Sequence, residues 1–102
     1  MTLSLRIERE AEDDIAAATQ WYSLRSQDLA ERFIADLNEC MVFLVRDGLS
    51  PALIGKYHRQ FPLATFPFNV VYTVIGDLVL VERVYHMKRD PKRKLRRKGR
   101  KP

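Results

Sequence analysis

FPFNVVYTVIGDLVLVERVY, residues 66–85, is the stretch that decides the fold. Valine, phenylalanine, tyrosine and other strand-forming residues fill it on both sides of Gly76-Asp77, a pair typical of a two-residue hairpin turn. The sequence therefore predicts one strand over 66–75, a second over 78–85, and antiparallel pairing between them.

The two-residue turn also fixes the register of this hairpin. Ile75 should face Leu78, and the predicted pairs continue as Tyr72 with Val81, Val70 with Arg83, Phe68 with Tyr85, and about Pro67 with His86. Alternation then places two sets of side chains on opposite faces: Phe68, Val70, Tyr72, Val74, Val79, Val81, Arg83 and Tyr85 on one, and Asn69, Val71, Thr73, Ile75, Leu78, Leu80, Glu82 and Val84 on the other. Neither set is polar throughout, so the sequence leaves open which face the helices cover.

Two helices are predicted upstream of the hairpin. Apolar residues recur at helical spacing in the first, from Ala11 to Tyr22, behind a cluster of acids at 10–14 that suits a helix N-terminus. The second should run from about residue 26 to 47, with Ser26 as its cap and Gly48 as its stop. Its apolar stripe is Ala30, Phe33, Ile34, Leu37, Met41, Leu44 and Val45, and the residues off the stripe are Glu31, Arg32, Asp36 and Glu39.

The remaining segments complete an α+β fold. Residues 2–7 alternate in polarity and predict an N-terminal strand, residues 48–56 read as a loop, and residues 57–61 can form a short strand. The predicted order is an N-terminal strand, an antiparallel helical hairpin, a C-terminal antiparallel β-meander and a basic C-terminal tail. We expect residues 1–91 to form a single domain and residues 92–102 to form a flexible tail.

Positive charge is concentrated at the C-terminus. The net charge is +5, but residues 88–102 carry +9 and residues 1–87 carry −4. Such a tail attracts phosphates or an acidic partner, and a solvated end without a dedicated ligand is equally compatible with it. The candidate contact residues for a partner or nucleic acid are Lys88, Arg89, Lys92, Arg93, Lys94, Arg96 and Arg97.

Several classes of protein and of site are not indicated. No apolar run approaches the ~18 residues of a membrane span, and the first residues do not read as a secretion signal. Cys40 is the only cysteine, so it cannot form an internal disulfide, and its position in the second helix suggests a core residue. We therefore expect a cytoplasmic protein without a membrane partner. The sequence contains no paired-cysteine metal motif, phosphate-binding glycine loop or nucleophile elbow, so no metal site and no cofactor are predicted.

Four polar residues, His86, Arg89, Arg59 and Arg83, are candidates for chemistry, and Trp21 is a candidate for a partner contact. His86 closes the last predicted strand close to Arg89, where it can serve as a general acid or position a phosphate; the alternative is a structural histidine at a strand end. Arg59 can bind phosphate or carboxylate, or can be a solvated strand residue. Arg83 either reaches the edge of its apolar face or marks that face as functional. Trp21 is a candidate partner contact, unless it packs on the helical hairpin.

The whole layout resembles the RelE/ParE superfamily of bacterial toxins over about residues 2–91. The segments that carry the resemblance are Ala11-Glu12-Asp13-Asp14-Ile15, Trp21-Tyr22, Ala30-Glu31-Arg32-Phe33, Tyr57-His58-Arg59, Phe66-Pro67-Phe68-Asn69-Val70-Val71-Tyr72 and Val84-Tyr85-His86-Met87-Lys88-Arg89-Asp90-Pro91. The resemblance implies the toxin of a type II toxin–antitoxin pair, of the plasmid-stabilisation kind, which a small and acidic antitoxin holds inactive. We expect that antitoxin to lay a helix or strand across exposed apolar surface of the toxin.

The superfamily divides by target. RelE-like members cleave messenger RNA on the ribosome with a set of cations and a tyrosine, whose positions fall here on His58, Gln60, Asn69 and Leu95, so that only Arg89 is kept. ParE-like members poison DNA gyrase, and the segments 66–68 and 86–91 are more similar to that branch. The resemblance therefore favours a ParE-like toxin that acts on gyrase. The alternatives are a ribosome-dependent mRNA endoribonuclease, with His86, Arg89, Arg59 and Arg83 as catalytic residues, and a non-toxic relative that only binds an antitoxin.

Overall fold

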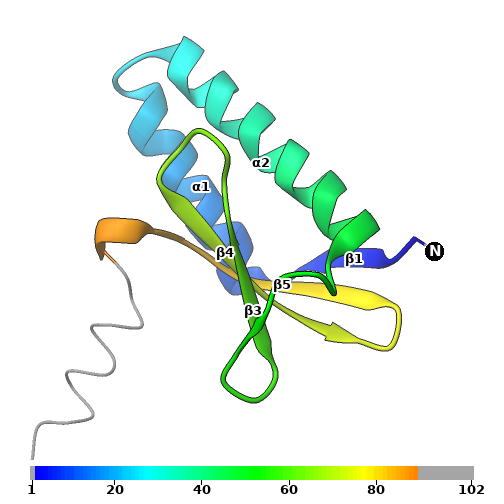
Figure 1. Ribbon diagram of the computed structural model, residues 1–102. Coiled ribbons are helices and arrows are strands. Elements are labelled where there is room, and N and C mark those ends of the chain that lie inside the picture. Colours follow the sequence, from blue (N-terminus) through cyan, green and yellow to red (C-terminus); the bar gives the residue numbers. More distant parts are fainter. Residues whose placement is uncertain (1, 90–102) are drawn as a thin grey trace, which may run out of the picture.

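A mixed five-stranded sheet packs against two helices in the computed structural model, which describes residues 2–89 (Figure 1). Along the chain the elements are β1 (Ser4–Ile7), α1 (Arg9–Ser23), α2 (Gln27–Asp47), β2 (Leu53–Ile54), β3 (His58–Pro62), β4 (Phe68–Ile75), β5 (Leu78–His86) and the 3₁₀ turn η1 (Met87–Arg89). The sheet order is β1-β5-β4-β3-β2. The α+β fold predicted from the sequence is confirmed, and the predicted tail at residues 92–102 lies outside the described residues.

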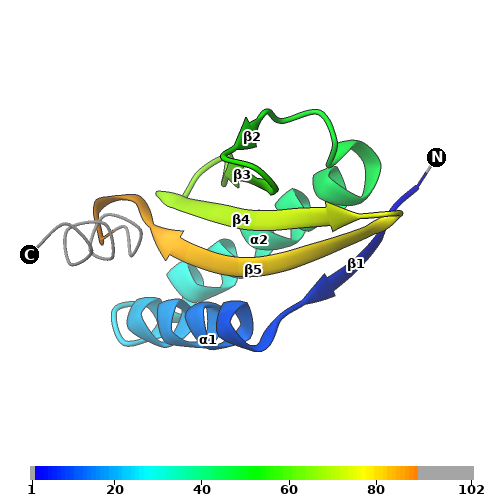
Figure 2. The same ribbon diagram turned by 90° about the horizontal axis from the view of Figure 1, so that it is seen from below.

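The two ends of the sheet differ from the prediction. β1 is shorter than the predicted strand over 2–7, and it pairs in parallel with β5, with Leu5 opposite Val79 (Figure 2). At the other end β2 lies inside the predicted loop, where it pairs with the start of β3. The alternating pattern of the sequence predicted β1 but not its partner, which lies far along the chain. β2 has only two residues, too few to leave a periodic pattern.

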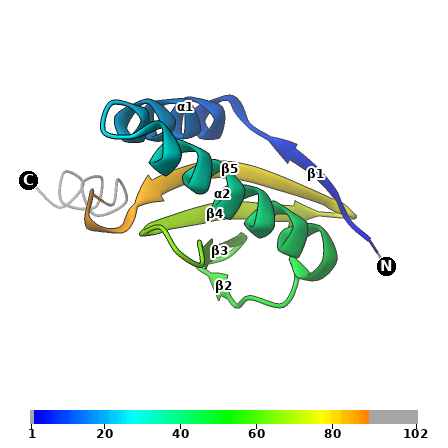
Figure 3. The same cartoon turned by 90° about the horizontal axis from the view of Figure 1, so that it is seen from above.

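The helices lie on one side of the sheet. Figures 2 and 3 show α2 across one face and α1 alongside β5. The covered face is built from residues of β4 and β5 with little or no exposure: Phe68, Val70, Tyr72, Val79, Val81 and Val84. Aromatic rings join this face to the helices, since Phe33 of α2 and Tyr22 of α1 pack against Phe66 and Phe68. The choice of face that the sequence left open is thereby decided.

A β-bulge corrects the predicted register of the hairpin. The pairing follows the prediction from Ile75–Leu78 to Tyr72–Val81, and then shifts by one residue, so that Val70 faces Val84 and Phe68 faces His86. Glu82 is the extra residue of β5. The shift moves Arg83 off the face that the helices cover, and Val84, which is 2% exposed, takes its place on that face. The predicted pairs of Val70 with Arg83 and of Phe68 with Tyr85 are therefore wrong.

The two ends of α2 differ in how far the sequence predicted them. At the N-terminus the Ser26 hydroxyl accepts a hydrogen bond from the Leu29 amide (3.3 Å), as the sequence predicts. At the C-terminus Gly48 has φ −61°, which is right-handed, so its role is not the left-handed stop that glycine usually supplies. A Cβ at Gly48 would lie 2.5 Å from the Leu44 carbonyl oxygen. Glycine is needed here because the last turn of α2 brings the Leu44 carbonyl against this position. The Gly48 carbonyl in turn accepts a hydrogen bond from the Tyr72 hydroxyl of the sheet (2.7 Å).

Asp36 departs from its predicted place. It lies off the apolar stripe of α2, which indicated a solvated side chain, yet it is only 7% exposed. Its carboxylate accepts hydrogen bonds from the backbone amides of Thr65 (2.9 Å) and Phe66 (2.8 Å) in the loop before β4. The loop supplies the donors that allow this charge to be buried. No helix among the described residues is long and apolar enough to cross a membrane.

Candidate functional site

A pocket of about 280 Å³ opens between α1 and the end of β5. Its lining combines an apolar floor with a few polar groups: Asp14, Ala17, Ala18, Trp21, Tyr22, Phe68, Arg83, Val84, Tyr85 and His86. Two of the candidate residues from the sequence, Arg83 and His86, are thus brought together. The lining comes mainly from α1 and from the end of β5, two elements that lie side by side (Figure 3).

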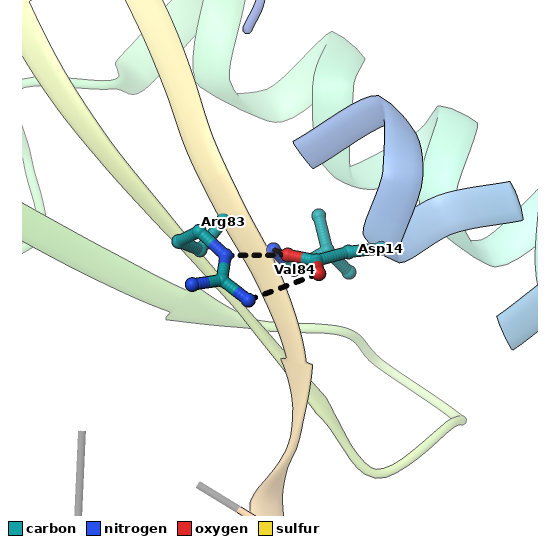
Figure 4. A network of polar contacts seen from close by, with 3 residues as sticks. All are labelled: Asp14, Arg83 and Val84. Carbon is teal, nitrogen blue, oxygen red and sulfur yellow. Dashed lines mark hydrogen bonds and ion pairs between the residues drawn. The ribbon is translucent and has the colours of Figure 1, made fainter. Parts of the chain in front are cut away.

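Asp14 and Arg83 form the polar wall of this pocket (Figure 4). The carboxylate of Asp14 binds Nε of Arg83 at 2.8 Å and Nη2 at 3.0 Å, and it also accepts the Val84 amide at 2.9 Å. The contact exists because β1 stops short: its last backbone bond to β5 runs from the Glu8 amide to the Val81 carbonyl (2.8 Å). Beyond that point a side chain of α1 replaces the missing strand.

The ion pair sets the electrostatics of the wall. Hydrogen bonding to Asp14 is the main cause that raises the pKa of Arg83, against an opposing effect of burial. The guanidinium is therefore charged at every physiological pH, but one carboxylate already compensates its charge. Sequence reasoning did not single out Asp14, because the contact spans 69 residues and its only signal is one acid in an acidic stretch.

His86 lies at the mouth of the pocket with its ring edge-on to Phe68, at 5.2 Å between centroids. Its Nδ1 accepts a hydrogen bond from the Lys88 amide (3.1 Å), so Nε2 carries the proton of the neutral ring. His86 faces Phe68 rather than Pro67, and it is the Met87 amide that bonds the Pro67 carbonyl (2.9 Å). The turn η1 follows directly and ends at Arg89.

Arg59 is not brought to this pocket. It pairs with Tyr72 in the β3–β4 ladder, four residues along β4 from the pocket residue Phe68. Its guanidinium donates to the backbone carbonyls of Leu49 (3.2 Å) and Pro51, and so holds the loop after α2. Of the candidate contact residues, Lys88 is exposed in η1, while Lys92, Arg93, Lys94, Arg96 and Arg97 lie outside the described residues.

The uncovered face of the sheet holds a second polar group of residues. His58 Nε2 lies 2.8 Å from the carboxylate of Glu82, the bulge residue, and the same carboxylate accepts from the Thr73 hydroxyl at 3.0 Å. Nearby, the Tyr85 hydroxyl donates to Gln60 (2.9 Å). The two β3 positions that match the RelE-like cations are therefore occupied by side chains that bond within the sheet.

Trp21 forms the outer wall of the pocket. It is partly exposed, as expected for a partner contact, and it also packs against the helical hairpin, so both interpretations from the sequence apply. It is 42% exposed, and it also packs edge-on against Tyr22 at 5.2 Å between centroids. The guanidinium of Arg25 covers its ring, with Cζ 3.3 Å from the centroid. An exposed tryptophan stacked with arginine is typical of residues that anchor protein interfaces.

A second pocket, of about 330 Å³, lies between α2 and β3 and contains the thiol of Cys40. Burial raises the pKa of this thiol from 9.0 to about 12, and the charge of Asp36 adds to the effect. The thiol form is therefore favoured at neutral pH, which disfavours a cysteine nucleophile here, and the 5% exposure of Cys40 agrees with the predicted core role. Within residues 2–89 no group of three or more histidine, cysteine or acidic side chains is arranged to hold a metal ion.

Comparison with known proteins matches the chain to one family. The profile of the family described as ParE toxin of type II toxin-antitoxin system, parDE, matches residues 5–91. A chain from the solved structure of the chromosomal ParDE TA system from P. aeruginosa has the same fold, with a TM-score of 0.72 and 21% identity, and the match covers 83% of this chain and 96% of that one. No curated protein matches significantly. Because the profile spans far more than half of the sequence, the chain belongs to the ParE toxin family of type II toxin–antitoxin systems.

Proposed function

We propose that this protein acts on DNA gyrase as the toxin of its pair, and that a small antitoxin keeps it inactive until the antitoxin is lost. Membership of the ParE family supports the toxin role and the antitoxin partner. Gyrase is a cytoplasmic target, so the proposal also places the protein in the cytoplasm.

The observation that carries the choice of target is the pairing of Arg83 with Asp14. Cleavage of RNA at this pocket would need positive charge free to stabilise the negative charge that develops on the phosphate. Here Arg83 is compensated, and Arg59 is engaged by two carbonyls elsewhere. Both arginines serve the fold, which favours a contact surface for gyrase over a nuclease centre.

Expression of the protein alone in a bacterium tests the proposal. We expect growth arrest, loss of supercoiling by purified gyrase on addition of the protein, and intact messenger RNA on ribosomes. Co-expression of the product of the adjacent gene should restore growth. Cleavage of messenger RNA with unaffected supercoiling would mean that the target is messenger RNA and not gyrase. Normal growth in the presence of folded protein would mean that the protein binds an antitoxin but is not toxic.

The residues at the end of β5 provide the second test. We expect the double variant His86→Ala/Arg89→Ala to lose most of its toxicity, because the two residues are the candidate functional groups at and just after the end of β5. Arg32→Ala is the matched control, since Arg32 is an exposed arginine whose ion pair within residues 2–89 is with Asp28 of the same helix. Circular dichroism and thermal unfolding verify that both variants fold. Full toxicity of a folded double variant would remove this end of the sheet from the contact surface.

A further inference from the structure

The pocket between α1 and β5 has room for one large apolar side chain. Its volume is about 280 Å³, while an apolar cavity of about 150 Å³ takes a benzene ring. The methyl groups of Ala17 and Ala18 and the rings of Trp21 and Phe68 line it. Ala17 and Trp21 are exposed in the free protein, so the apolar surface is reachable without any movement of the core.

Arg83 lies against this apolar surface in a fixed orientation. Asp14 binds Nε and Nη2, and Figure 4 shows Nη1 directed away from Asp14. Within residues 2–89 Nη1 makes no hydrogen bond. An arginine held in this way carries no uncompensated charge, but its Nη1 keeps hydrogen-bond donors for a second carboxylate, and that carboxylate binds without the cost of ordering a long side chain.

The charges around the mouth favour an acidic ligand. The guanidinium of Arg25 lies over the Trp21 ring, and Lys88 is exposed two residues after His86, so two lining residues each have a cation close by in space or in sequence. The negative charge of Asp14 is compensated by Arg83. Glu10, whose charge also acts on Arg83, lies one helical turn before Asp14 and disfavours a carboxylate on that side.

From these three features we infer that the pocket is an anchor site for an acidic segment of the antitoxin. The segment places one aromatic or large aliphatic side chain between Ala17 and Phe68, and a neighbouring carboxylate binds the Nη1 side of Arg83. The inference rests on the proposed function for the identity of the partner. It adds the chemistry that selects the partner: an apolar anchor beside a carboxylate.

A small probe tests the site without the antitoxin. The probe is 3-phenylpropionate, and 3-phenylpropanamide is its neutral analogue; both are titrated into the full chain and followed by NMR at the indole N–H of Trp21 and at Nε of Arg83. We expect the acid to shift both signals and to bind about tenfold more tightly than the amide, a difference of about 1.4 kcal/mol. Equal binding of the two compounds, or shifts confined to other residues, overturns the inference.

Two neighbouring alanines supply the matched variants. Ala17→Phe fills the mouth of the pocket, whereas Ala16→Phe adds the same ring to the same helix at an exposed position outside the lining. We expect Ala17→Phe alone to lose binding of the probe. Arg83→Gln, verified as folded, should bind acid and amide equally. Retained preference for the acid in Arg83→Gln, or equal effects of the two alanine variants, contradicts the site.

The antitoxin arm separates this inference from the proposed function. The product of the adjacent gene is titrated against wild type, Ala17→Phe and Ala16→Phe in the gyrase assay, and we expect at least a tenfold higher antitoxin requirement for Ala17→Phe only. If wild type does not inhibit gyrase, the proposed function is wrong, but the probe titration still shows whether the pocket binds an apolar group with a carboxylate. If wild type inhibits gyrase and the antitoxin neutralises wild type and both variants at the same concentration, the inference about the pocket is wrong while the proposed function stands.

Two other ligands of the pocket would also overturn the inference. The chain's own tail occupies the pocket if deletion of residues 92–102 raises the affinity for the probe. A second copy of the chain occupies it if the probe dissociates a dimer.

Discussion

At the scale of single residues, we expect the buried carboxylate of Asp36 to contribute to stability. It bonds two backbone amides in the loop that leads into β4. We expect Asp36→Ala to lower the free energy of unfolding by about 2–4 kcal/mol, because both amides lose a charged acceptor and stay partly buried. Urea unfolding followed by circular dichroism measures the change.

Asp28→Ala is the control for this prediction. Asp28 also lies on α2, but its ion pair with Arg32 is exposed, so its removal should cost less than about 1 kcal/mol. Similar costs for the two variants would mean that burial of Asp36 contributes little.

Two buried acids with raised pKa values predict a loss of stability in alkali. Burial raises the pKa of Cys40 from 9.0 to about 12 and that of Tyr72 from 10.0 to about 12. Because the unfolded chain releases these protons more readily than the folded one, their contribution is complete below pH 9 and is lost as the pH rises towards 12. The free energy of unfolding, measured by urea titration at each pH, should fall across this range.

Substitutions separate the two groups. Cys40→Ala should remove the part of the decline that begins near pH 9, and Tyr72→Phe the part that begins near pH 10. Tyr57→Phe, which removes a hydroxyl from a tyrosine that is 64% exposed, is the matched control. An alkaline profile that is flat in wild type would contradict the prediction.

At the scale of elements, the junction between α2 and the sheet depends on Gly48. We expect Gly48→Ala to destabilise the protein by about 1–3 kcal/mol, since the new methyl group would be 2.5 Å from the carbonyl oxygen of Leu44 in the same helix, so that the last turn of α2 must shift. The same movement lengthens the bond from the Tyr72 hydroxyl to the Gly48 carbonyl. Urea unfolding of the single variants Gly48→Ala and Tyr72→Phe and of the double variant should therefore show non-additive costs.

Ser50→Ala, at an exposed position two residues later, is the control and should be nearly neutral. Gly76→Ala differs in mechanism: a Cβ there meets no atom within 4 Å, and any cost comes from its φ of +60°. Additive costs for Gly48→Ala and Tyr72→Phe would show that the helix end does not move as a unit with the sheet.

At the scale of the whole molecule, the distribution of charge separates the folded body from the tail. Residues 92–102 carry eight cations and no acid, so their deletion changes the net charge from +5 to −3. We expect the deletion to leave thermal stability unchanged and to weaken binding of the antitoxin or of nucleic acid, with a smaller dependence on salt. Titrations from low to high salt measure both quantities. Unchanged affinity and salt dependence would identify the tail as a solvated end.

Local patterns were enough to predict most elements and the family. The periodicity of Ala30 to Val45, the cap at Ser26 and the turn at Gly76 are properties of neighbouring residues, and each appears in the structure where the sequence placed it. The choice of covered face was open, because both faces of the hairpin carry apolar residues. Arg83 and His86 were identified as candidates, but Asp14 was not, and Arg59 lies elsewhere.

Several features were decided by the tertiary structure alone, and they share one physical reason: each depends on groups that are distant in the sequence. The bulge at Glu82 moves Val84 into the core and Arg83 to the strand edge, where Asp14 takes the place of the strand that ends at Ile7. Asp36 is buried because a loop 29 residues away offers its amides. The sequence by itself determined the helices, the hairpin turn and the charge of the tail, since these depend on local conformational preference and composition. Register, the identity of the buried face and the pocket required the energy of packing between elements, which no local pattern contains.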